Sequence, residues 1–217
     1  MPISHNGDMS RFAKLKGLRR SRSGVEPESR GLWHIVVAGG TSADWESFSE
    51  EDWDSRLGSL AEVAQQAGAR YVTVHPFEVL ADPTGRSPVR TSPNLHRREI
   101  VVPGQFSHEE AGSTITAVAD PVVDGRQRIC DEIALWPDGQ EITEETLGQA
   151  LFGPAGEPDL VVILGPPNRL PVSLVWELAY SELVFIPSSW EALSSADVVR
   201  AVQEFAQRSR RFGGVEV

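Results

Sequence analysis

Residues 34–40, His34-Ile35-Val36-Val37-Ala38-Gly39-Gly40, decide the fold class of this chain, because they read as a buried strand that enters a tight turn. Behind Ser49, apolar residues recur at helical spacing until Gly68, which is a typical helix stop. Residues 71–74, Tyr71-Val72-Thr73-Val74, then read as a second strand. A strand, a helix and a strand within about 40 residues form a βαβ unit on a parallel sheet. The sequence therefore predicts an α/β fold.

The rest of the chain predicts a single domain with a six-stranded, mainly parallel sheet flanked by helices. The further strands are expected at residues 100–102, 114–118, 160–164 and 184–186. The further helices are expected at Arg126–Leu135, Glu144–Phe152, Pro171–Glu182 and Ala196–Phe212. The link at residues 78–94 contains three prolines and no apolar period, so it is expected to be a loop. The domain is expected to occupy residues 31–217, behind a basic segment at residues 1–30.

The composition favours an intracellular protein without a nucleic-acid partner. A formal net charge of −11 disfavours binding to DNA or RNA, which needs a dominant basic surface. The single cysteine, Cys130, excludes an internal disulfide and a cysteine-based metal cluster. No apolar run approaches the roughly 18 residues that a membrane span needs, and no signal peptide opens the chain. We therefore expect a cytoplasmic protein that is either free in solution or peripheral to a membrane.

Residues 10–22 are the exception to the acidic composition. Basic residues alternate there with apolar ones at helical spacing, namely Arg11, Lys14, Lys16, Arg19, Arg20 and Arg22 with Phe12, Leu15 and Leu18. A short amphipathic helix of this kind would touch anionic lipid at a membrane surface. The alternative is a solvated, partly disordered basic tail, and the narrow apolar face favours it.

The last third of the chain carries several blocks that occur together, and in this order, in one enzyme family. They are Asp124-Gly125-Arg126, Ile142-Thr143-Glu144-Glu145-Thr146-Leu147, Trp176-Glu177-Leu178-Ala179-Tyr180-Ser181-Glu182-Leu183 and Arg210-Arg211-Phe212-Gly213-Gly214. They resemble the Gly-Gly-Arg, Ile-Asp-Glu-Glu-x-Leu, Trp-Gln-x-Ala-Tyr-x-Glu-Leu and Arg-x-Gly blocks of the cis-prenyltransferases, whose best-known member is undecaprenyl diphosphate synthase. The resemblance covers residues 30–217, is strongest from residue 124, and implies a cis-prenyltransferase-like fold.

The front of the chain departs from this family where the allylic diphosphate and Mg²⁺ would bind. The family motif His-x-Ala-x-x-Met-Asp-Gly-Asn-Gly-Arg-Trp aligns with residues 34–45, in which His34 and Trp45 keep their places. Gly40 stands in place of the Asp that helps to hold Mg²⁺, and Asp44 stands in place of the Arg. A carboxylate repels a diphosphate, whereas Arg attracts it. The resemblance therefore implies that this loop does not bind an allylic diphosphate in the family's way.

Two further departures concern the second substrate and the product. The family's phosphate-binding stretch, Arg-Thr-Gly-Gly-Glu-x-Arg-x-Ser, corresponds to residues 163–171, in which only Gly165 and Arg169 survive. The missing Arg and Ser remove charge-assisted bonds to the homoallylic diphosphate. The loop at residues 78–94 replaces the long helix that walls the family's product tunnel, so the tunnel region is expected to be shortened. A growing polyprenyl chain gains about 0.8 kcal/mol per buried CH₂, and it loses that gain without a wall.

The retained blocks imply half of a shared site and no catalytic residue of the chain's own. Glu182 matches the family's Mg²⁺-linked Glu, so Mg²⁺ is expected at a site shared between subunits. The Arg-x-Gly element of the family reaches across the dimer interface into the neighbour's active site. Diphosphate contacts in trans are therefore expected from Arg169, Arg211, Phe212 and Gly213. The interface is expected to contain Trp176, Tyr180 and Glu182.

This pattern is similar to the non-catalytic partner subunits of heteromeric cis-prenyltransferases, such as the Nogo-B receptor. The leading hypothesis is a catalytically deficient subunit that pairs with an active homologue, or with itself, and contacts isoprenyl diphosphates. The first alternative is an autonomous Mg²⁺-dependent prenyltransferase for short allylic diphosphates, with Asp44 and Glu182 as metal ligands. The second is a homodimeric protein that binds a polyprenyl phosphate.

Overall fold

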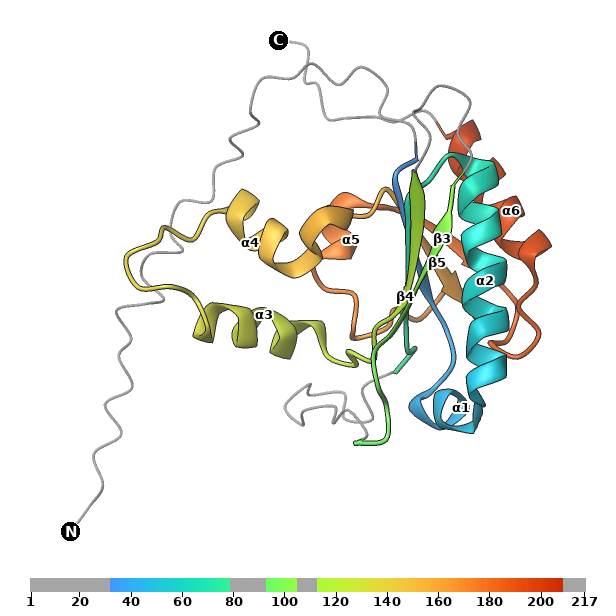
Figure 1. Cartoon of the computed structure of the whole chain (residues 1–217), viewed down its shortest axis with the longest axis horizontal. Helices are drawn as coiled ribbons and strands as arrows, with labels where there is room; N and C mark the ends of the chain where they lie inside the picture. Colours follow the sequence, from blue (N-terminus) through green and yellow to red (C-terminus); the bar gives the residue numbers. More distant parts are fainter. Residues whose placement is uncertain (1–31, 79–92, 105–112, 209–217) are drawn as a thin grey trace.

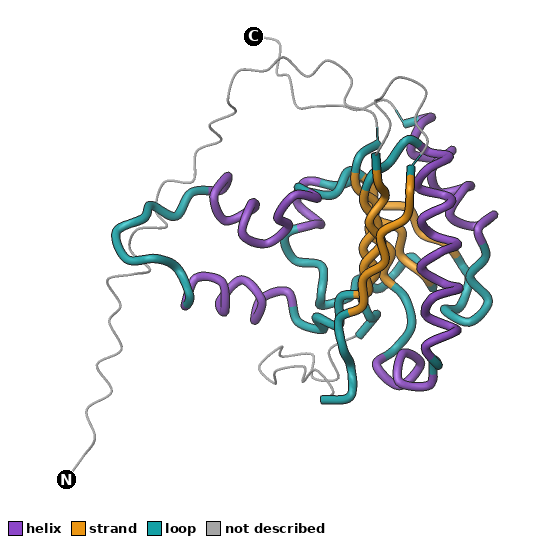
Figure 2. The backbone as a smooth tube through the Cα atoms, in the orientation of Figure 1, coloured by secondary structure: helices purple, strands orange, loops and turns teal. Residues whose placement is uncertain are grey.

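The computed structural model of the chain describes residues 32–78, 93–104 and 113–208. Six strands form one sheet in the order β3-β4-β2-β1-β5-β6, and helices cover both of its faces (Figures 1 and 2). All neighbouring strands are parallel except β3 and β4. The predicted single α/β domain with a mainly parallel six-stranded sheet is therefore confirmed.

The strands and helices follow one another largely as predicted. The strands are β1 (His34–Ala38), β2 (Tyr71–His75), β3 (Arg98–Pro103), β4 (Thr114–Ala119), β5 (Leu160–Leu164) and β6 (Glu182–Ile186). The helices are α1 (Ser42–Ser47), α2 (Glu50–Ala67), α3 (Gly125–Ala134), α4 (Glu144–Phe152), the 3₁₀ turn η2 (Gly153–Ala155), α5 (Glu177–Tyr180) and α6 (Ser195–Gln207). Among the described residues, the sequence patterns miss the short helix α1, which directly follows the Gly39-Gly40 turn, and the turn η2.

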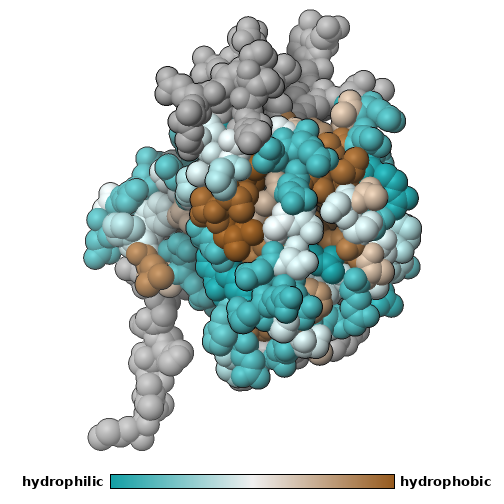
Figure 3. Space-filling view, turned by 45° about the vertical axis from the view of Figure 1, so that its right-hand side comes forward, coloured by the Kyte–Doolittle hydropathy of each residue, from teal (hydrophilic) through white to brown (hydrophobic). Residues whose placement is uncertain are grey.

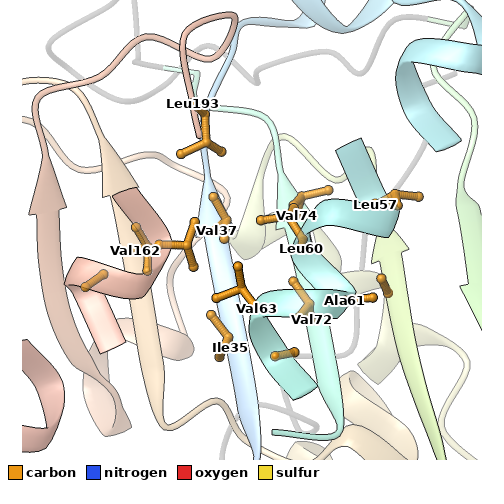
Figure 4. Packing of buried hydrophobic residues seen from close by; sticks show 14 of the residues in the cluster. Ile35, Val37, Leu57, Leu60, Ala61, Val63, Val72, Val74, Val162 and Leu193 are labelled. Atoms are coloured by element: carbon orange, nitrogen blue, oxygen red, sulfur yellow. The ribbon is translucent and has the colours of Figure 1, made fainter. Parts of the chain in front are cut away.

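The larger part of the core lies between the sheet and the helices α2 and α6. Side chains alternate along a strand, so Ile35 and Val37 of β1 point to this face. Figure 4 shows them packed with residues of β2, β5 and α2, namely Val72, Val74, Val162, Leu57, Leu60, Ala61 and Val63. Burying each of the valine, leucine and isoleucine side chains stabilises the fold by about 1.5–3 kcal/mol. This layer therefore holds the strands, and the loops at their ends, in place.

Helix α2 begins and ends where the sequence predicts. The Ser49 hydroxyl accepts from the Asp52 N–H, and the Asp52 carboxylate accepts from the Ser49 N–H at 2.8 Å. At the other end Gly68 has a φ of 80°, in the left-handed region that favours glycine. The helix thus returns the chain to β2, where Tyr71 pairs with His34.

The opposite face of the sheet, covered by α3, α4 and α5, has a smaller apolar core. It consists of Val36, Ala38, Val161, Ile163 and Leu174. The polar side chains of His34, His75 and Glu177 are also fully buried on this side. Burying polar groups costs free energy unless they find partners, so this face relies on specific contacts more than on apolar area.

The helix predicted over Pro171–Glu182 is wrong for most of its length, because only Glu177–Tyr180 is helical. Ser181 has an extended backbone, and Glu182 begins β6, where it pairs with Leu160 of β5. Pairing with a neighbouring strand outweighs helical spacing here, since strand preference depends on tertiary context.

The last predicted helix, Ala196–Phe212, also ends earlier than expected. Its final helical residue is Gln207, and Arg208 has an extended backbone. Residues 209–212 lie outside the described chain, as does most of the loop predicted at residues 78–94.

The parallel strands define two edges of the sheet, which we call the carboxyl edge and the amino edge. β1, β2, β4, β5 and β6 run in one direction, so their ends meet at the carboxyl edge. In Figure 1, α1 lies below the sheet at this edge and the last turn of α6 lies at the top, at the amino edge.

Candidate functional site

Three loops meet at the carboxyl edge, namely residues 39–42 after β1, residues 76–78 after β2 and residues 165–173 after β5. Backbone hydrogen bonds join them: Gly39 N–H donates to His75 O at 3.0 Å, Phe77 N–H to Gly40 O at 2.7 Å and Val172 N–H to Glu78 O at 3.2 Å. We call these segments the carboxyl-edge loops. Parallel α/β sheets generally bind ligands outside this edge.

The backbone N–H groups that follow Gly39-Gly40 are already bonded to carboxylates of the chain itself. Asp44 Oδ2 accepts from the Thr41 N–H at 2.7 Å and from the Thr41 hydroxyl at 2.9 Å. Glu78 Oε1 accepts from the Ser42 N–H at 2.7 Å. Backbone N–H groups at such a turn can bind phosphate oxygens, but here two negative charges take them. These carboxylates repel a further anion.

Arg169 lies in the third carboxyl-edge loop, where its side chain is exposed. Within the described ranges we find no ion pair for its guanidinium. The loop itself is held at both ends, because Gly165 N–H donates to Ile186 O at 2.8 Å and Gly125 N–H donates to Val172 O at 2.9 Å. Its role as a diphosphate contact stays a prediction.

The predicted interface residues Trp176, Tyr180 and Glu182 lie together at the opposite, amino edge. Trp176 Nε1 donates to Glu157 Oε1 at 2.7 Å, shortly before β5, and its ring centroid is 5.8 Å from that of Tyr180. Glu182 Oε2 lies 3.3 Å from Arg208 Nη1 at the end of α6. We call Trp176, Tyr180, Glu182 and Arg208 the amino-edge cluster. The structure thus pairs Trp176 with Tyr180 and Glu182 with Arg208, and places both pairs at the edge opposite to Arg169.

The residues predicted to hold Mg²⁺ do not form a site within one chain. Asp44 caps α1 at the carboxyl edge, whereas Glu182 is paired with Arg208 at the amino edge. Nowhere in the described part of the chain do three His, Cys, Asp or Glu side chains come together as a metal ion requires. These residues therefore do not fit Mg²⁺ on their own. The predicted contacts Arg211, Phe212 and Gly213 lie outside the described residues.

A buried ion pair between α3 and α5 is the main polar feature that sequence patterns miss. Arg128 Nη1 lies 3.3 Å from Glu177 Oε1, and the two side chains are 16% and 2% exposed. The same guanidinium donates to Leu151 O at the end of α4 and lies over the Phe152 ring. One cation thus joins α3, α4 and α5. The partners are 49 residues apart, so no local pattern could find them.

His34, at the start of β1, is held neutral by its surroundings. Its Nδ1–H donates to Gly156 O at 2.8 Å, and its Nε2 accepts from the Thr73 hydroxyl at 3.0 Å. Burial lowers the pKa of His34 from 6.5 to about 4. The hydrogen bond to Gly156 O opposes this shift, and the charges of His75 and Arg128 add to it. Burial also lowers the pKa of His75, whose Nδ1 has no hydrogen-bond partner among the described residues. Both rings act as neutral parts of the core near pH 7.

Acid is therefore expected to weaken the fold through His34. Above pH 6.5 the ring is neutral in the folded and the unfolded chain, so its stabilising contribution is fully present. Between pH 6.5 and about 4 only the unfolded chain binds the proton, so the free energy of unfolding falls with pH by about 3 kcal/mol from this group. Urea unfolding at several pH values in this range, on the wild type and His34→Gln, measures the effect. Equal pH slopes for the two proteins would contradict it.

Exposed apolar side chains gather on the segment between β5 and β6. Leu170, Val175 and Tyr180 are 46%, 39% and 40% exposed, which makes three of the six large apolar side chains that are exposed in the described ranges. Figure 3 shows one face of the molecule, on which hydrophobic residues form separate brown patches within a largely hydrophilic surface. Among the helices of the described chain, none combines the length and apolar character that crossing a bilayer requires.

Known proteins resemble this chain over different lengths. The family described as "Putative undecaprenyl diphosphate synthase" matches residues 108–213. "Isoprenyl transferase 2" of Bradyrhizobium diazoefficiens is 37% identical over 110 residues, which span 50% of this chain and only 40% of that protein. "Isoprenyl transferase" of Brucella abortus is 31% identical over 95% of this chain and 86% of its own length.

The fold agrees with these sequence matches. The crystal structure of a probable undecaprenyl diphosphate synthase from Campylobacter jejuni aligns with 84% of this chain and 99% of its own, with a TM-score of 0.53 and 18% sequence identity. At that identity the likeness concerns the fold alone. The match to the Brucella protein extends over nearly all of both sequences. The chain therefore belongs to the cis-prenyltransferase, or undecaprenyl diphosphate synthase, family.

Proposed function

We propose that this chain is a catalytically deficient cis-prenyltransferase subunit that pairs with an active homologue in a polyprenyl diphosphate synthase. The observation that carries the proposal is the state of the Gly39-Gly40 turn. The N–H groups of Thr41 and Ser42, which directly follow it, donate to Asp44 and Glu78, so two carboxylates stand where the family binds an allylic diphosphate. At 4 Å and an effective dielectric constant of 20, two like charges repel by about 4 kcal/mol. This arrangement supports the proposal that the chain has lost its own substrate site.

The start of the C-terminal segment supports a role in trans. Arg208 donates to Leu183 O at the amino end of β6, whereas the Gly39-Gly40 turn lies at the carboxyl edge, two strands away. The described chain therefore ends at the edge of the sheet opposite to its own turn. This position favours a neighbour's site as the target of the C-terminal segment.

Exposed apolar side chains on the segment that links β5 to β6 support pairing with another subunit. Leu170, Val175 and Tyr180 expose apolar area there, and β6 is the outermost strand of the sheet. Apolar side chains of this kind gain free energy when a partner covers them. Tyr180 is both one of these exposed residues and one of the predicted interface residues, so the two observations fit a contact in this region.

In this proposal the isoprenyl diphosphates and Mg²⁺ bind at a site shared with the active partner, whose own motif supplies the metal-binding Asp. Arg169 and Arg211 would add cationic contacts to the diphosphate oxygens. The basic residues 10–22 would hold the complex at an anionic membrane surface on its cytoplasmic side. A self-dimer would lack any complete diphosphate turn, so an active homologue is the preferred partner.

The test is co-production of the chain with a family member that carries the complete first motif. Labelled isopentenyl diphosphate transfer to farnesyl diphosphate is measured for each chain alone and for the purified complex. We expect background turnover from this chain alone and at least tenfold more from the complex than from the partner alone. A complex with the partner's motif Asp changed to Ala serves as the control and should be inactive.

Two other results would overturn the proposal. Mg²⁺-dependent turnover by the isolated chain, lost in Asp44→Ala, would establish the autonomous prenyltransferase. In native mass spectrometry, a stable homodimer that retains a polyprenyl phosphate and does not bind any motif-bearing homologue would establish the homodimeric binding protein.

A further inference from the structure

Arg208 ties the end of α6 to the beginning of β6. Its Nη1 donates to Leu183 O at 2.6 Å and lies 3.3 Å from Glu182 Oε2, while its Nη2 bonds to Glu204 one turn earlier in α6. The backbone of Arg208 leaves the helix in an extended conformation. One guanidinium therefore holds the last turn of α6 against the first residues of β6.

Glu182 is engaged by this contact and is not poised to hold a metal ion. Its side chain is 38% exposed, that of Arg208 is 36% exposed, and the two charges neutralise each other. Partial burial lowers the pKa of Arg208, but its bonds to Glu204 and Glu182 outweigh this and raise the pKa overall. A metal ion at Glu182 would have to displace the guanidinium, and the described residues offer no cluster of carboxylates to help it.

The position of Arg208 in the chain gives this contact a consequence for function. Arg211 follows three residues later, so its backbone can lie at most about 11 Å from the anchored residue. We propose that Arg208 and Glu182 form a clamp that sets where residues 210–214 leave the domain, so that Glu182 is a positioning residue and not a Mg²⁺ ligand. The functional half of this inference rests on the proposed pairing with an active homologue. The clamp itself is a property of the free chain.

The clamp is tested first in the free chain by a double-mutant cycle with Glu182→Gln, Arg208→Gln and the combined variant. Hydrogen exchange at residues 205–208 should become about fivefold faster in each single variant, as expected for a partly exposed ion pair. The combined variant should exchange no faster than Arg208→Gln, because the two residues act as one unit. Glu204→Gln, which removes the other carboxylate on the same guanidinium, is the matched control. Unchanged exchange in Glu182→Gln would overturn the clamp whether or not a partner exists.

The second test uses the active complex and separates positioning from metal binding. Glu182→Gln and Arg208→Gln should both lower kcat about tenfold, with the same Mg²⁺ concentration for half-maximal activity as the wild type. Arg208→Lys, which keeps the charge but not the forked geometry, should recover part of the loss. A metal ligand would behave differently, since Glu182→Gln alone would then shift the Mg²⁺ dependence. That shift, with Arg208→Gln unaffected, would overturn the positioning role and leave the pairing proposal intact.

Discussion

Replacing Glu177 with alanine is expected to lower the free energy of unfolding by about 3–5 kcal/mol, because it leaves the guanidinium of Arg128 unpaired in a largely buried position. Arg128 also bonds to Leu151 O and lies over Phe152, so the unpaired charge stays between α3, α4 and α5. The buried His75 offers no negative charge to replace Glu177, and the positive charge of Arg128 lowers the pKa of His75. Urea unfolding followed by circular dichroism measures the loss.

Two variants separate the charge from the packing at this site. Glu177→Gln keeps the shape and one acceptor, and glutamine is what the family motif carries at this place, so it should cost only about 1–2 kcal/mol. Combining Glu177→Leu with Arg128→Met removes both charges and should be less destabilising than Glu177→Ala, since apolar residues often replace a buried pair at little cost. A Glu177→Ala protein within about 1 kcal/mol of the wild type would show that solvent reaches Arg128.

Local patterns were sufficient for the parts of this fold that local physics determines. The strand at 34–38, the Ser49 cap and the Gly68 stop each depend on residues within a few positions of one another, and all three are confirmed. The helix predicted over Pro171–Glu182 fails because its end depends on β5. Glu182 pairs with Leu160, which is distant in sequence, and that pairing decides between helix and strand.

The candidate site was predictable in outline and not in its contacts. The family motifs pointed to the Gly39-Gly40 turn as the altered part, on the ground that Asp44 replaces an Arg. They did not indicate that Glu78, from the loop after β2, caps the same turn through Ser42 N–H. Nor did they indicate that Arg208 forms an ion pair with Glu182. Both contacts join segments that only the folded sheet brings together, so residue types could be read from the sequence but their partners could not.

Restoring the family's Asp with Gly40→Asp is expected to destabilise the fold by about 2–5 kcal/mol and to leave the isolated chain inactive. Gly40 has a φ of 73°, and a Cβ there would lie 2.6 Å from Trp190 Cγ. Trp190 is 3% exposed and stacks on Trp45 and Phe48, so it has little room to move aside. Urea unfolding and the prenyl transfer assay measure the two effects.

Gly68→Asp is the matched control, because Gly68 has a similar φ of 80° but nothing within 4 Å of an added Cβ. It should cost only about 1 kcal/mol, so the difference between the two variants measures the packing against Trp190. Equal stabilities would mean that Trp190 yields, and turnover by the isolated Gly40→Asp chain would mean that one carboxylate was all that was missing. We expect neither, because Asp44 and Glu78 still hold the N–H groups of the turn in this variant. The backbone, the tryptophan packing and the two carboxylates close the turn jointly, so reversing one change cannot reopen it.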